Sequence, residues 1–268
     1  MHCGDGLPEV RRIREAYGPN DRQFGEWFLP GGESAPLVIL IHGGYWRPVY
    51  RLDIEEPSAY ALAEAGFAVW SIEYRTYESG WPVTFEDVAT GVEYGVQHAP
   101  DRGVDATRKA LCGHSAGGAL AQWVTSRRQL PPDAPGANPE ATTFDLVVLS
   151  APVACLTLAS TDHLGMGAVD TLMGGRPEDV PERYAVSDPA HLTPDPGRRL
   201  ILHGDADVDV LMTQSECIRD HLVDHGVDVE LIVLPGDDHY RILDPMSEVS
   251  LLRQQALADA LALQPPSA

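Results

Sequence analysis

Residues 111–118 read Leu111-Cys112-Gly113-His114-Ser115-Ala116-Gly117-Gly118 and contain the pattern G-x-S-x-G, centred on Ser115. This pattern is typical of a serine held on a sharp turn between a β-strand and a helix. Small residues two positions before and two positions after the serine let the strand and the helix approach closely on a strained backbone. The flanking sequence agrees, because residues 108–112 can end a buried strand and apolar residues then recur at helical spacing. The stretch therefore predicts an exposed, nucleophilic serine at a strand-to-helix turn.

Apolar strand-like runs and helix-like runs alternate along the rest of the chain. Strands are expected at residues 23–29, 36–41, 67–74, 108–112, 144–153, 199–203 and 229–234, and helices at 57–65, 84–96, 116–124, 213–226 and 245–261. Thr84 and Thr213 each precede an acidic residue by three positions, which is typical of a helix N-terminus. We assign no element to residues 1–22, and we expect residues 23–29 at the edge of the sheet. The alternation, without an internal repeat, predicts a mostly parallel central sheet covered by helices on both faces.

The composition favours one large acidic domain. The chain has 268 residues, 44% of them hydrophobic, which is enough to bury a substantial core. Its formal net charge of −21 argues against nucleic acid or an anionic membrane as a partner. Residues 1–14 contain no apolar run typical of a secretory signal, and no stretch reaches the roughly 18 to 20 apolar residues of a membrane-spanning helix. We therefore expect a cytoplasmic protein.

The four cysteines show no spacing typical of a metal site or a redox motif. Cys112 lies in an apolar strand and Cys217 on a predicted helix, and Cys3 and Cys155 complete the set. We expect all four to be reduced thiols of the core.

Residues 154–197 are too long for a plain connection between two elements. Their mixed composition, with several Gly, Pro and Met residues, predicts a small cap or lid with short helices. We therefore expect a single domain over residues 1–268, with 154–197 as a cap insertion.

Candidate catalytic residues follow two further predicted strands. Reactive groups in a parallel sheet lie on the loops at the carboxyl ends of the strands. His239 follows the last strand, where its imidazole can accept the proton of the Ser115 hydroxyl. Asp207 lies three residues after Gly204, at the end of the preceding strand, where a carboxylate can orient the imidazole and stabilise its cation. Asp205 and Asp209 compete with Asp207 for this role.

The same acidic stretch resembles a calcium loop, with Asp205, Asp207, Asp209 and Glu216 at positions 1, 3, 5 and 12. Val210 occupies the position that requires glycine, and residues 213–216 predict the start of a helix. We therefore expect no metal and no cofactor.

Six motifs in chain order resemble one known family. The stretch His42-Gly43-Gly44-Tyr45-Trp46 resembles the H-G-G-x-W motif of kynurenine formamidases (arylformamidases) and of related bacterial α/β-hydrolases. Other stretches similar to the bacterial relatives are Glu73-Tyr74-Arg75, Gly80-Trp81-Pro82, the Ser115 motif, His203-Gly204-x-x-Asp207-x-x-Val210 and Asp238-His239. The chain order Ser, Asp, His is also that of α/β-hydrolases. The resemblance covers residues 36–261 and implies the α/β-hydrolase fold.

The resemblance also implies roles for individual residues. Ser115 would be the nucleophile, His239 the general base and acid, and Asp207 the orienting acid. The main-chain N–H groups of Gly44, Tyr45 and Ala116 would form the oxyanion hole.

Aromatic residues and one arginine are candidates for binding the substrate. Trp46, Trp81 and Tyr240 are expected in an aromatic pocket, although Trp46 can equally belong to the core. Arg47 either binds a substrate carboxylate or forms a surface salt bridge.

The expected reaction is metal-independent hydrolysis of a small ester or amide through an acyl-enzyme. The family resemblance favours N-formylkynurenine as the substrate, which would yield kynurenine and formate. The first alternative is a carboxylesterase for small aryl or alkyl esters that uses the same residues. A non-catalytic ligand-binding relative and an acyl-transfer or biosynthetic relative are further alternatives on the same fold. We expect a small-molecule partner, no nucleic acid and no membrane, and leave a homodimer open.

Overall fold

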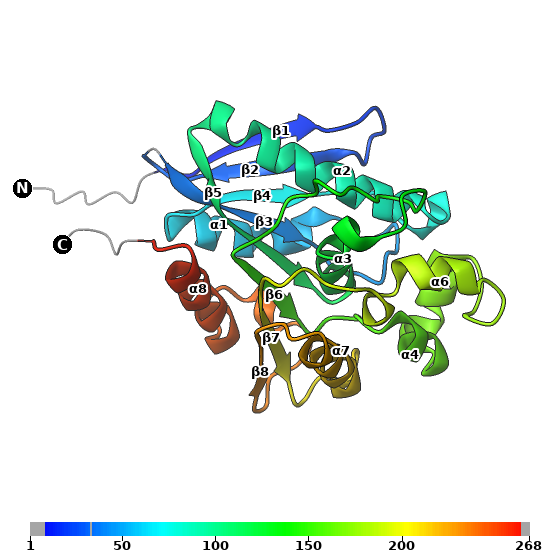
Figure 1. Ribbon diagram of the computed structural model, residues 1–268. Helices are drawn as coiled ribbons and strands as arrows, with labels where there is room; N and C mark the ends of the chain where they lie inside the picture. The colour runs from blue at the N-terminus through cyan, green and yellow to red at the C-terminus, as the bar shows by residue number, and fades with distance from the viewer. Residues whose placement is uncertain (1–8, 33, 264–268) are drawn as a thin grey trace, which may run out of the picture.

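A single eight-stranded sheet forms the centre of the computed structural model, which describes residues 9–32 and 34–263 (Figure 1). Its strand order is β1-β2-β4-β3-β5-β6-β7-β8. The strands are β1 (Arg11–Ala16), β2 (Phe24–Leu29), β3 (Ala35–Ile41), β4 (Ala68–Ile72), β5 (Val104–His114), β6 (Leu146–Ser150), β7 (Arg198–Gly204) and β8 (Val229–Leu234). All neighbours from β4 to β8 pair in parallel, and β1 and β2 are antiparallel. The mostly parallel sheet predicted from the sequence is confirmed.

Strand β1 is absent from the sequence-based prediction, and the expectation that residues 23–29 form the edge is wrong. The edge strand is β1, and β2 lies between β1 and β4. The sequence of β1 is highly charged, so it lacks the apolar alternation of a typical strand. Its Arg12 and Arg14 each donate to the carboxylate of Glu26 on β2, at 2.7 and 2.8 Å. These ion pairs, which depend on a partner strand, stabilise a strand that its own pattern does not predict.

Helices cover both faces of the sheet, as expected. The α-helices are α1 (Glu56–Glu64), α2 (Val83–His98), α3 (Ala116–Val124), α4 (Leu156–Thr161), α5 (Ala168–Met173), α6 (Pro181–Ser187), α7 (Met212–Asp224) and α8 (Glu248–Ala260). Short 3-10 helices are η1 (Leu52–Glu55), η2 (Tyr77–Ser79), η3 (Pro100–Arg102), η4 (Arg127–Gln129), η5 (Leu164–Met166), η6 (Pro189–His191) and η7 (Arg241–Leu243). No helix in residues 9–32 and 34–263 combines the length and the apolar character needed to cross a bilayer. The cytoplasmic location stays a prediction.

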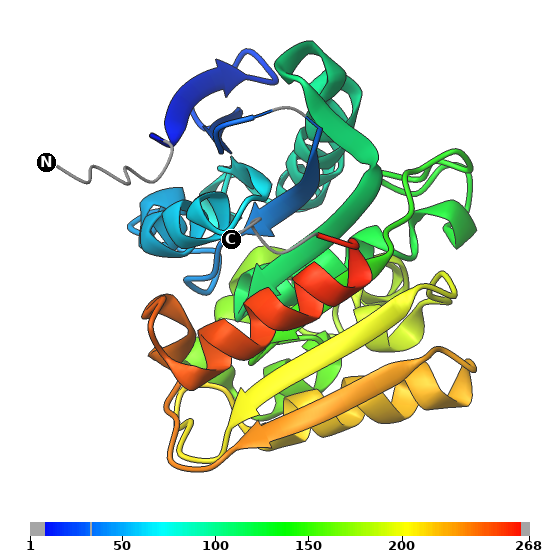
Figure 2. The same cartoon turned by 90° about the vertical axis from the view of Figure 1, so that its left-hand side faces the viewer.

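Two separate cores fill the space between the sheet and the two helical layers. Helices α1 and α8 pack on one face (Figure 2), and α2, α3 and α7 pack on the other. Residues of β3 alternate between them, because Leu37, Ile39 and Ile41 join one core and Val38 and Leu40 join the other. This period of two on fully buried strands is why the sequence reads as a continuous apolar run.

Both predicted threonine caps are wrong. Thr84 lies within α2, and its hydroxyl donates to the carbonyl oxygen of Arg75 at 2.7 Å. Helix α7 begins at Met212, after Leu211, without a side-chain cap. In contrast, Ser247 caps α8 by accepting from the N–H of Ser250.

Residues 154–197 contain α4, η5, α5, α6 and η6, so the short helices expected there are present (Figure 1). Asp188, which is fully buried, accepts from the N–H groups of Leu156 and Thr157 at the start of α4. This carboxylate satisfies main-chain donors that a helix start leaves free. The assignment of the segment as a cap stays a prediction.

A disulfide joins Cys155, next to α4, to Cys217 on α7. The expectation of four reduced thiols is therefore wrong for this pair, whereas Cys112 is free and buried. The two paired cysteines are separated by 62 residues, so their proximity depends on the tertiary fold and not on a local spacing. Cys3 lies outside the described residues.

Candidate active site

Ser115 lies at the junction of β5 and α3 on a strained backbone. Its φ and ψ are 57° and −121°, a conformation that is uncommon for a residue with a side chain. Main-chain hydrogen bonds hold the turn: the Ser115 N–H donates to the Ser150 carbonyl at 2.8 Å, and the Ser115 carbonyl accepts from Val153 at 3.1 Å. The turn is therefore fixed to the end of β6, and the serine is presented at the carboxyl edge of the sheet.

The glycines on either side of Ser115 are required by close main-chain contacts. A Cβ atom on Gly113 would clash with the carbonyl of Gly117, and a Cβ on Gly117 would clash with the carbonyl of Ile41. Only glycine at both positions lets α3 start so close to the ends of β3 and β5. This is the physical reason for the spacing seen in the sequence.

The loop after β3 supplies unpaired main-chain donors beside Ser115. Gly44, Tyr45 and Trp46 all have positive φ, at 110°, 52° and 54°. Within the described residues, the N–H groups of Gly44, Tyr45 and Ala116 make no hydrogen bond, so all three are free to donate to a ligand. The Tyr45 hydroxyl donates to the carbonyl of Asp209 at 2.5 Å and ties this loop to the one after β7. Burial, and next the Asp209 carboxylate, raises the pKa of Tyr45, which keeps it a neutral donor.

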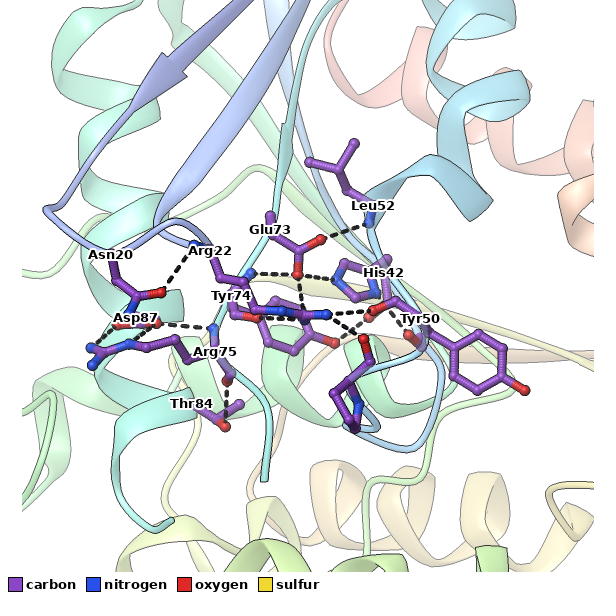
Figure 3. Close-up of polar contacts among 12 residues, drawn as sticks. Asn20, Arg22, His42, Tyr50, Leu52, Glu73, Tyr74, Arg75, Thr84 and Asp87 are labelled. Carbon is purple, nitrogen blue, oxygen red and sulfur yellow. Dashed lines mark hydrogen bonds and ion pairs between the residues drawn. The ribbon is translucent and has the colours of Figure 1, made fainter. Parts of the chain in front are cut away.

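A buried network of charged side chains supports the loop after β3 (Figure 3). His42 Nδ1 lies 2.7 Å from the carbonyl oxygen of Gly43, and His42 Nε2 lies 3.4 Å from Glu73 Oε1. Glu73 also accepts from Arg22 at 3.0 Å and from the N–H of Leu52 at 3.1 Å. Burial alone would raise the pKa of Glu73, but the contacts with His42 and Arg22 outweigh it and lower that pKa.

This network orients a peptide group of the loop. Because the Gly43–Gly44 peptide is planar and trans, its N–H points opposite to its carbonyl. His42 holds the carbonyl of Gly43, so the N–H of Gly44 points away from His42.

Asp207 and His239 meet at the ends of β7 and β8. Asp207 Oδ2 accepts from His239 Nδ1 at 2.7 Å, and His203 Nε2 lies 3.3 Å from the same oxygen. Asp207 Oδ1 accepts from the N–H of Val210 at 2.8 Å. Burial alone would raise the pKa of Asp207, but the hydrogen bonds from His203 and His239 outweigh it, so the pKa is lowered. The carboxylate therefore stays ionised and acts as an acceptor toward His239.

The competing aspartates make different contacts. Asp205 accepts from the N–H of Gly236 at 2.6 Å and joins the β7 and β8 loops. Asp209 offers its main-chain carbonyl to Tyr45. Of these three aspartates only Asp207 contacts His239.

Ser115 and His239 line one cavity of about 180 Å³ at the carboxyl edge of the sheet. The cavity wall is mainly apolar and is formed by Gly44, Tyr45, Tyr50, Ile54, His114, Ser115, His239, Tyr240 and Leu243. No hydrogen bond joins Ser115 to His239 among the described residues; such bonds are often long before a substrate binds. A larger open groove, about 530 Å³, lies between α2 and residues 136–138, but no Ser, Cys or His of the described chain lines it.

The four residues predicted to bind substrate have different positions. Tyr240 lines the cavity and is 56% exposed. Trp46 is 1% exposed and belongs to the core, so it does not line the cavity. Arg47 donates to the carbonyl of Gly165 at 2.7 Å and so links the β3 loop to residues 154–197, which is neither of the two roles considered for it. Trp81 donates to the hydroxyl of Ser187 at 2.9 Å and packs against the same segment.

The sequence did not identify several residues of the site. Tyr50, Ile54 and Leu243 line the cavity, and Glu55 lies behind it. Tyr50 to Glu55 follow the H-G-G-Y-W stretch after three intervening residues, so the continuation of that loop was the available signal. Leu243 lies four residues after His239, and nothing in its immediate sequence marks it.

The central sheet, its order and the turn at Ser115 define an α/β-hydrolase fold. The chain belongs to the BD-FAE family, whose model matches residues 28–222.

Comparison with known proteins agrees with this assignment. The chain is 27% identical over 237 residues to esterase LipQ of Mycobacterium tuberculosis strain H37Rv, which covers 83% of this chain and 55% of LipQ. It is 29% identical over 227 residues to an ethyl acetate hydrolase of Pseudomonas putida, covering 78% and 67% of the two chains. The chain thus spans about half the length of LipQ.

Solved structures show the same fold. A truncated form of a carbohydrate esterase from gut microbiota superposes with a TM-score of 0.81 at 20% identity, covering 97% of this chain and 99% of the other.

Proposed function

We propose that the chain is a serine hydrolase that cleaves small, uncharged esters, with Ser115 as nucleophile, His239 as base and Asp207 as orienting acid. The observation that carries the proposal is that Ser115 and His239 line the same cavity while Asp207 holds the other nitrogen of His239. The names of the relatives, an esterase and an ethyl acetate hydrolase, support the same reaction class.

The reaction begins with proton transfer from the Ser115 hydroxyl to His239 Nε2. The serine oxygen attacks the ester carbonyl carbon, and the carbonyl oxygen becomes an oxyanion. The free N–H groups of Gly44, Tyr45 and Ala116 would donate to it, each contributing about 3 kcal/mol of transition-state stabilisation. Asp207, with its lowered pKa, remains ionised and stabilises the imidazolium of His239.

The intermediate then collapses as His239 gives its proton to the leaving alcohol, which leaves an acyl group on Ser115. In the second half-reaction His239 deprotonates a water molecule, which attacks the acyl carbon. The bond from the acyl carbon to Ser115 then breaks as His239 returns the proton to the serine oxygen. The products are the carboxylic acid and the regenerated serine. Every proton is carried by His239, so the cycle needs no other acid or base.

The cavity favours a short, uncharged acyl or alcohol group. Its walls contain tyrosine, isoleucine and leucine side chains, and its volume is about 180 Å³. No Asp, Glu, Lys or Arg of the described residues lines it, so a charged group there would lose its hydration without a partner. The formamidase activity suggested by the sequence motifs stays a prediction that the same assay tests.

The experiment compares kcat/KM for p-nitrophenyl acetate, butyrate and octanoate with that for N-formylkynurenine, using Ser115→Ala as the control. We expect ester hydrolysis with at least about tenfold preference for the short acyl chains, because a longer chain overfills the cavity. Ser115→Ala should lower kcat by about 10⁵-fold and leave the circular dichroism spectrum unchanged. A fluorophosphonate should add to Ser115 in the native chain and not in the variant. Full activity of Ser115→Ala would overturn the mechanism, and turnover of the formamide alone would replace the esterase by a formamidase.

A further inference from the structure

His114, the residue before the nucleophile, connects the base to a buried carboxylate. Its Nε2 lies 3.0 Å from the main-chain oxygen of His239, and its Nδ1 lies 3.6 Å from Glu55 Oε1. The side chains of His114 and Glu55 are 5% and 3% exposed. The rings of His114 and His239 lie 4.7 Å apart. Three elements thus meet at one imidazole: the 3-10 helix η1, the end of β5 and the loop after β8.

The partners of His114 determine where its protons lie. A carbonyl oxygen only accepts hydrogen bonds, so Nε2 must carry a proton to donate to His239. An ionised carboxylate also only accepts, so an unprotonated Nδ1 would direct a lone pair at a negative charge. The 3.6 Å contact between His114 Nδ1 and Glu55 is therefore favourable only when one of the two groups carries a proton.

The surroundings of Glu55 decide which partner holds that proton. Burial alone would raise the pKa of Glu55, but the contact with His114, followed by the charges of Arg253 on α8 and His42 at the end of β3, lowers it. Among the described residues neither oxygen of Glu55 makes a hydrogen bond, and its ion-pair contact is with His114 Nδ1 at 3.6 Å. An ionised Glu55 favours a proton on His114 Nδ1, because opposite charges then face each other across 3.6 Å.

We propose that His114 is a positioning residue for His239, held as an imidazolium by Glu55. This rests on the proposed function, in which His239 is the catalytic base. The hydrogen bond fixes the main chain of the residue whose side chain must reach both Ser115 and Asp207. A displacement of the base by about 1 Å lowers the rate by about 10²-fold. The charged groups that face His114 and Glu55 are Arg253 and His42 on one side and His239 on the other.

The first test is nitrogen NMR of the histidine side chains, with the His114 signals assigned by their loss in His114→Gln. In the native chain we expect both ring nitrogens of His114 to stay protonated from pH 6 to pH 8. In Glu55→Gln the Nδ1 proton should be lost at pH 8, while the Nε2 proton remains. Glu56→Gln is the matched control, because Glu56 is the next residue and pairs with Arg12 instead. A neutral His114 in the native chain at pH 8 would overturn the proposal.

The second test separates the hydrogen bond from simple packing. In Glu55→Gln/His114→Gln both charges are removed, and the amide nitrogen of residue 114 can still donate to the His239 carbonyl. In Glu55→Gln/His114→Leu no donor remains. We expect the leucine variant to lose about 10²-fold in kcat with KM changed less than about threefold, and the glutamine variant to recover most of that loss. Equal activity of the two double variants, at matched melting temperatures, contradicts a positioning role.

The NMR test is independent of the proposed function, whereas the kinetic test requires that the native chain hydrolyses an ester. If the native chain hydrolyses no ester, the function is wrong, whereas the NMR experiment still decides the protonation of His114. If the leucine variant does not fold, the NMR comparison of the native chain with Glu55→Gln still stands. If esters are cleaved and Ser115→Ala is inactive but His114 is neutral, only this inference is wrong.

Discussion

Two buried histidines, one at the end of β3 and one at the end of β7, have closely similar surroundings and different tasks. His42 Nε2 lies 3.4 Å from Glu73, and His203 Nε2 lies 3.3 Å from Asp207. Both histidines are 1% exposed. The second nitrogen of His42 holds a main-chain carbonyl, whereas the second nitrogen of His203 lies 2.6 Å from the hydroxyl of Ser215. The pairs differ in what else the carboxylate binds.

Glu73 is surrounded by groups that take no part in the proposed proton transfers. Arg22 and two main-chain N–H groups complete its hydrogen bonds, so the network holds one peptide orientation in the loop after β3 (Figure 3). Asp207 instead binds His239, whose charge must change twice in each proposed catalytic cycle. His203 contacts the hydroxyl of Ser215 through Nδ1 and so ties Asp207 to helix α7. Glu73 thus supports the main chain of the loop after β3, whereas Asp207 would stabilise the charge that His239 gains in the proposed cycle.

The largest effect that this contrast predicts is on turnover. Asp207→Asn keeps an oxygen acceptor for the loop but removes the charge that stabilises the His239 imidazolium. We expect kcat to fall by about 10³- to 10⁴-fold with little change in KM. Steady-state kinetics on a short p-nitrophenyl ester measure this. Asp205→Asn is the matched control and should lose less than about tenfold, because within the described residues the Asp205 carboxylate accepts from the N–H of Gly236 and makes no hydrogen bond to His239. If Asp205→Asn were the more damaging change, the assignment of the acid would be wrong.

A smaller effect, mainly on stability, is expected when Glu73 is changed. Glu73→Gln leaves Arg22 and His42 without the buried charge that pairs with them. Breaking such a pair should lower the free energy of unfolding by about 3 kcal/mol. We expect kcat to fall only about tenfold, because the Gly43 carbonyl keeps its contact with His42. Urea unfolding and kinetics measure the two quantities. The control, Glu64→Gln, changes an exposed carboxylate of α1 and should alter neither. A kcat loss as large as that of Asp207→Asn, without loss of stability, would contradict the distinction between Glu73, which supports a loop, and Asp207, which acts in turnover.

The sequence predicted what depends on local pattern. Apolar runs predicted the parallel strands. The glycine spacing around Ser115 predicted a tight turn, and the structure shows that a Cβ at Gly113 or Gly117 would clash with the main chain there. Chain order and strand ends also suggested Asp207 and His239, which lie 2.7 Å apart although 32 residues separate them.

What the sequence did not predict depends on distant partners. Strand β1 needs Glu26 of β2, and the disulfide joins Cys155 to a cysteine 62 residues away. Trp46 follows Gly44 and Tyr45 directly in the loop after β3, yet its side chain belongs to the core. Glu55 carries no local signal, because its importance comes from His114 in another element. Periodicity and spacing depend on local geometry, so they do not predict pairs of charges or thiols that are distant in the sequence.

The smallest expected effect is the pH dependence of the stability that Glu73 provides. The pKa of Glu73 is lowered in the folded chain, against an ordinary value of about 4.3 in the unfolded chain. A lowered folded pKa contributes stability that is complete above the unfolded pKa and is lost as pH falls through the folded pKa. The difference in unfolding free energy between the native chain and Glu73→Gln should therefore be largest above about pH 5 and shrink toward pH 3. Urea titrations at several pH values measure it. A difference that grows on acidification would mean that Glu73 is buried as the neutral acid. Our assignment of Glu73 as an ionised carboxylate that supports the loop after β3 would then be wrong.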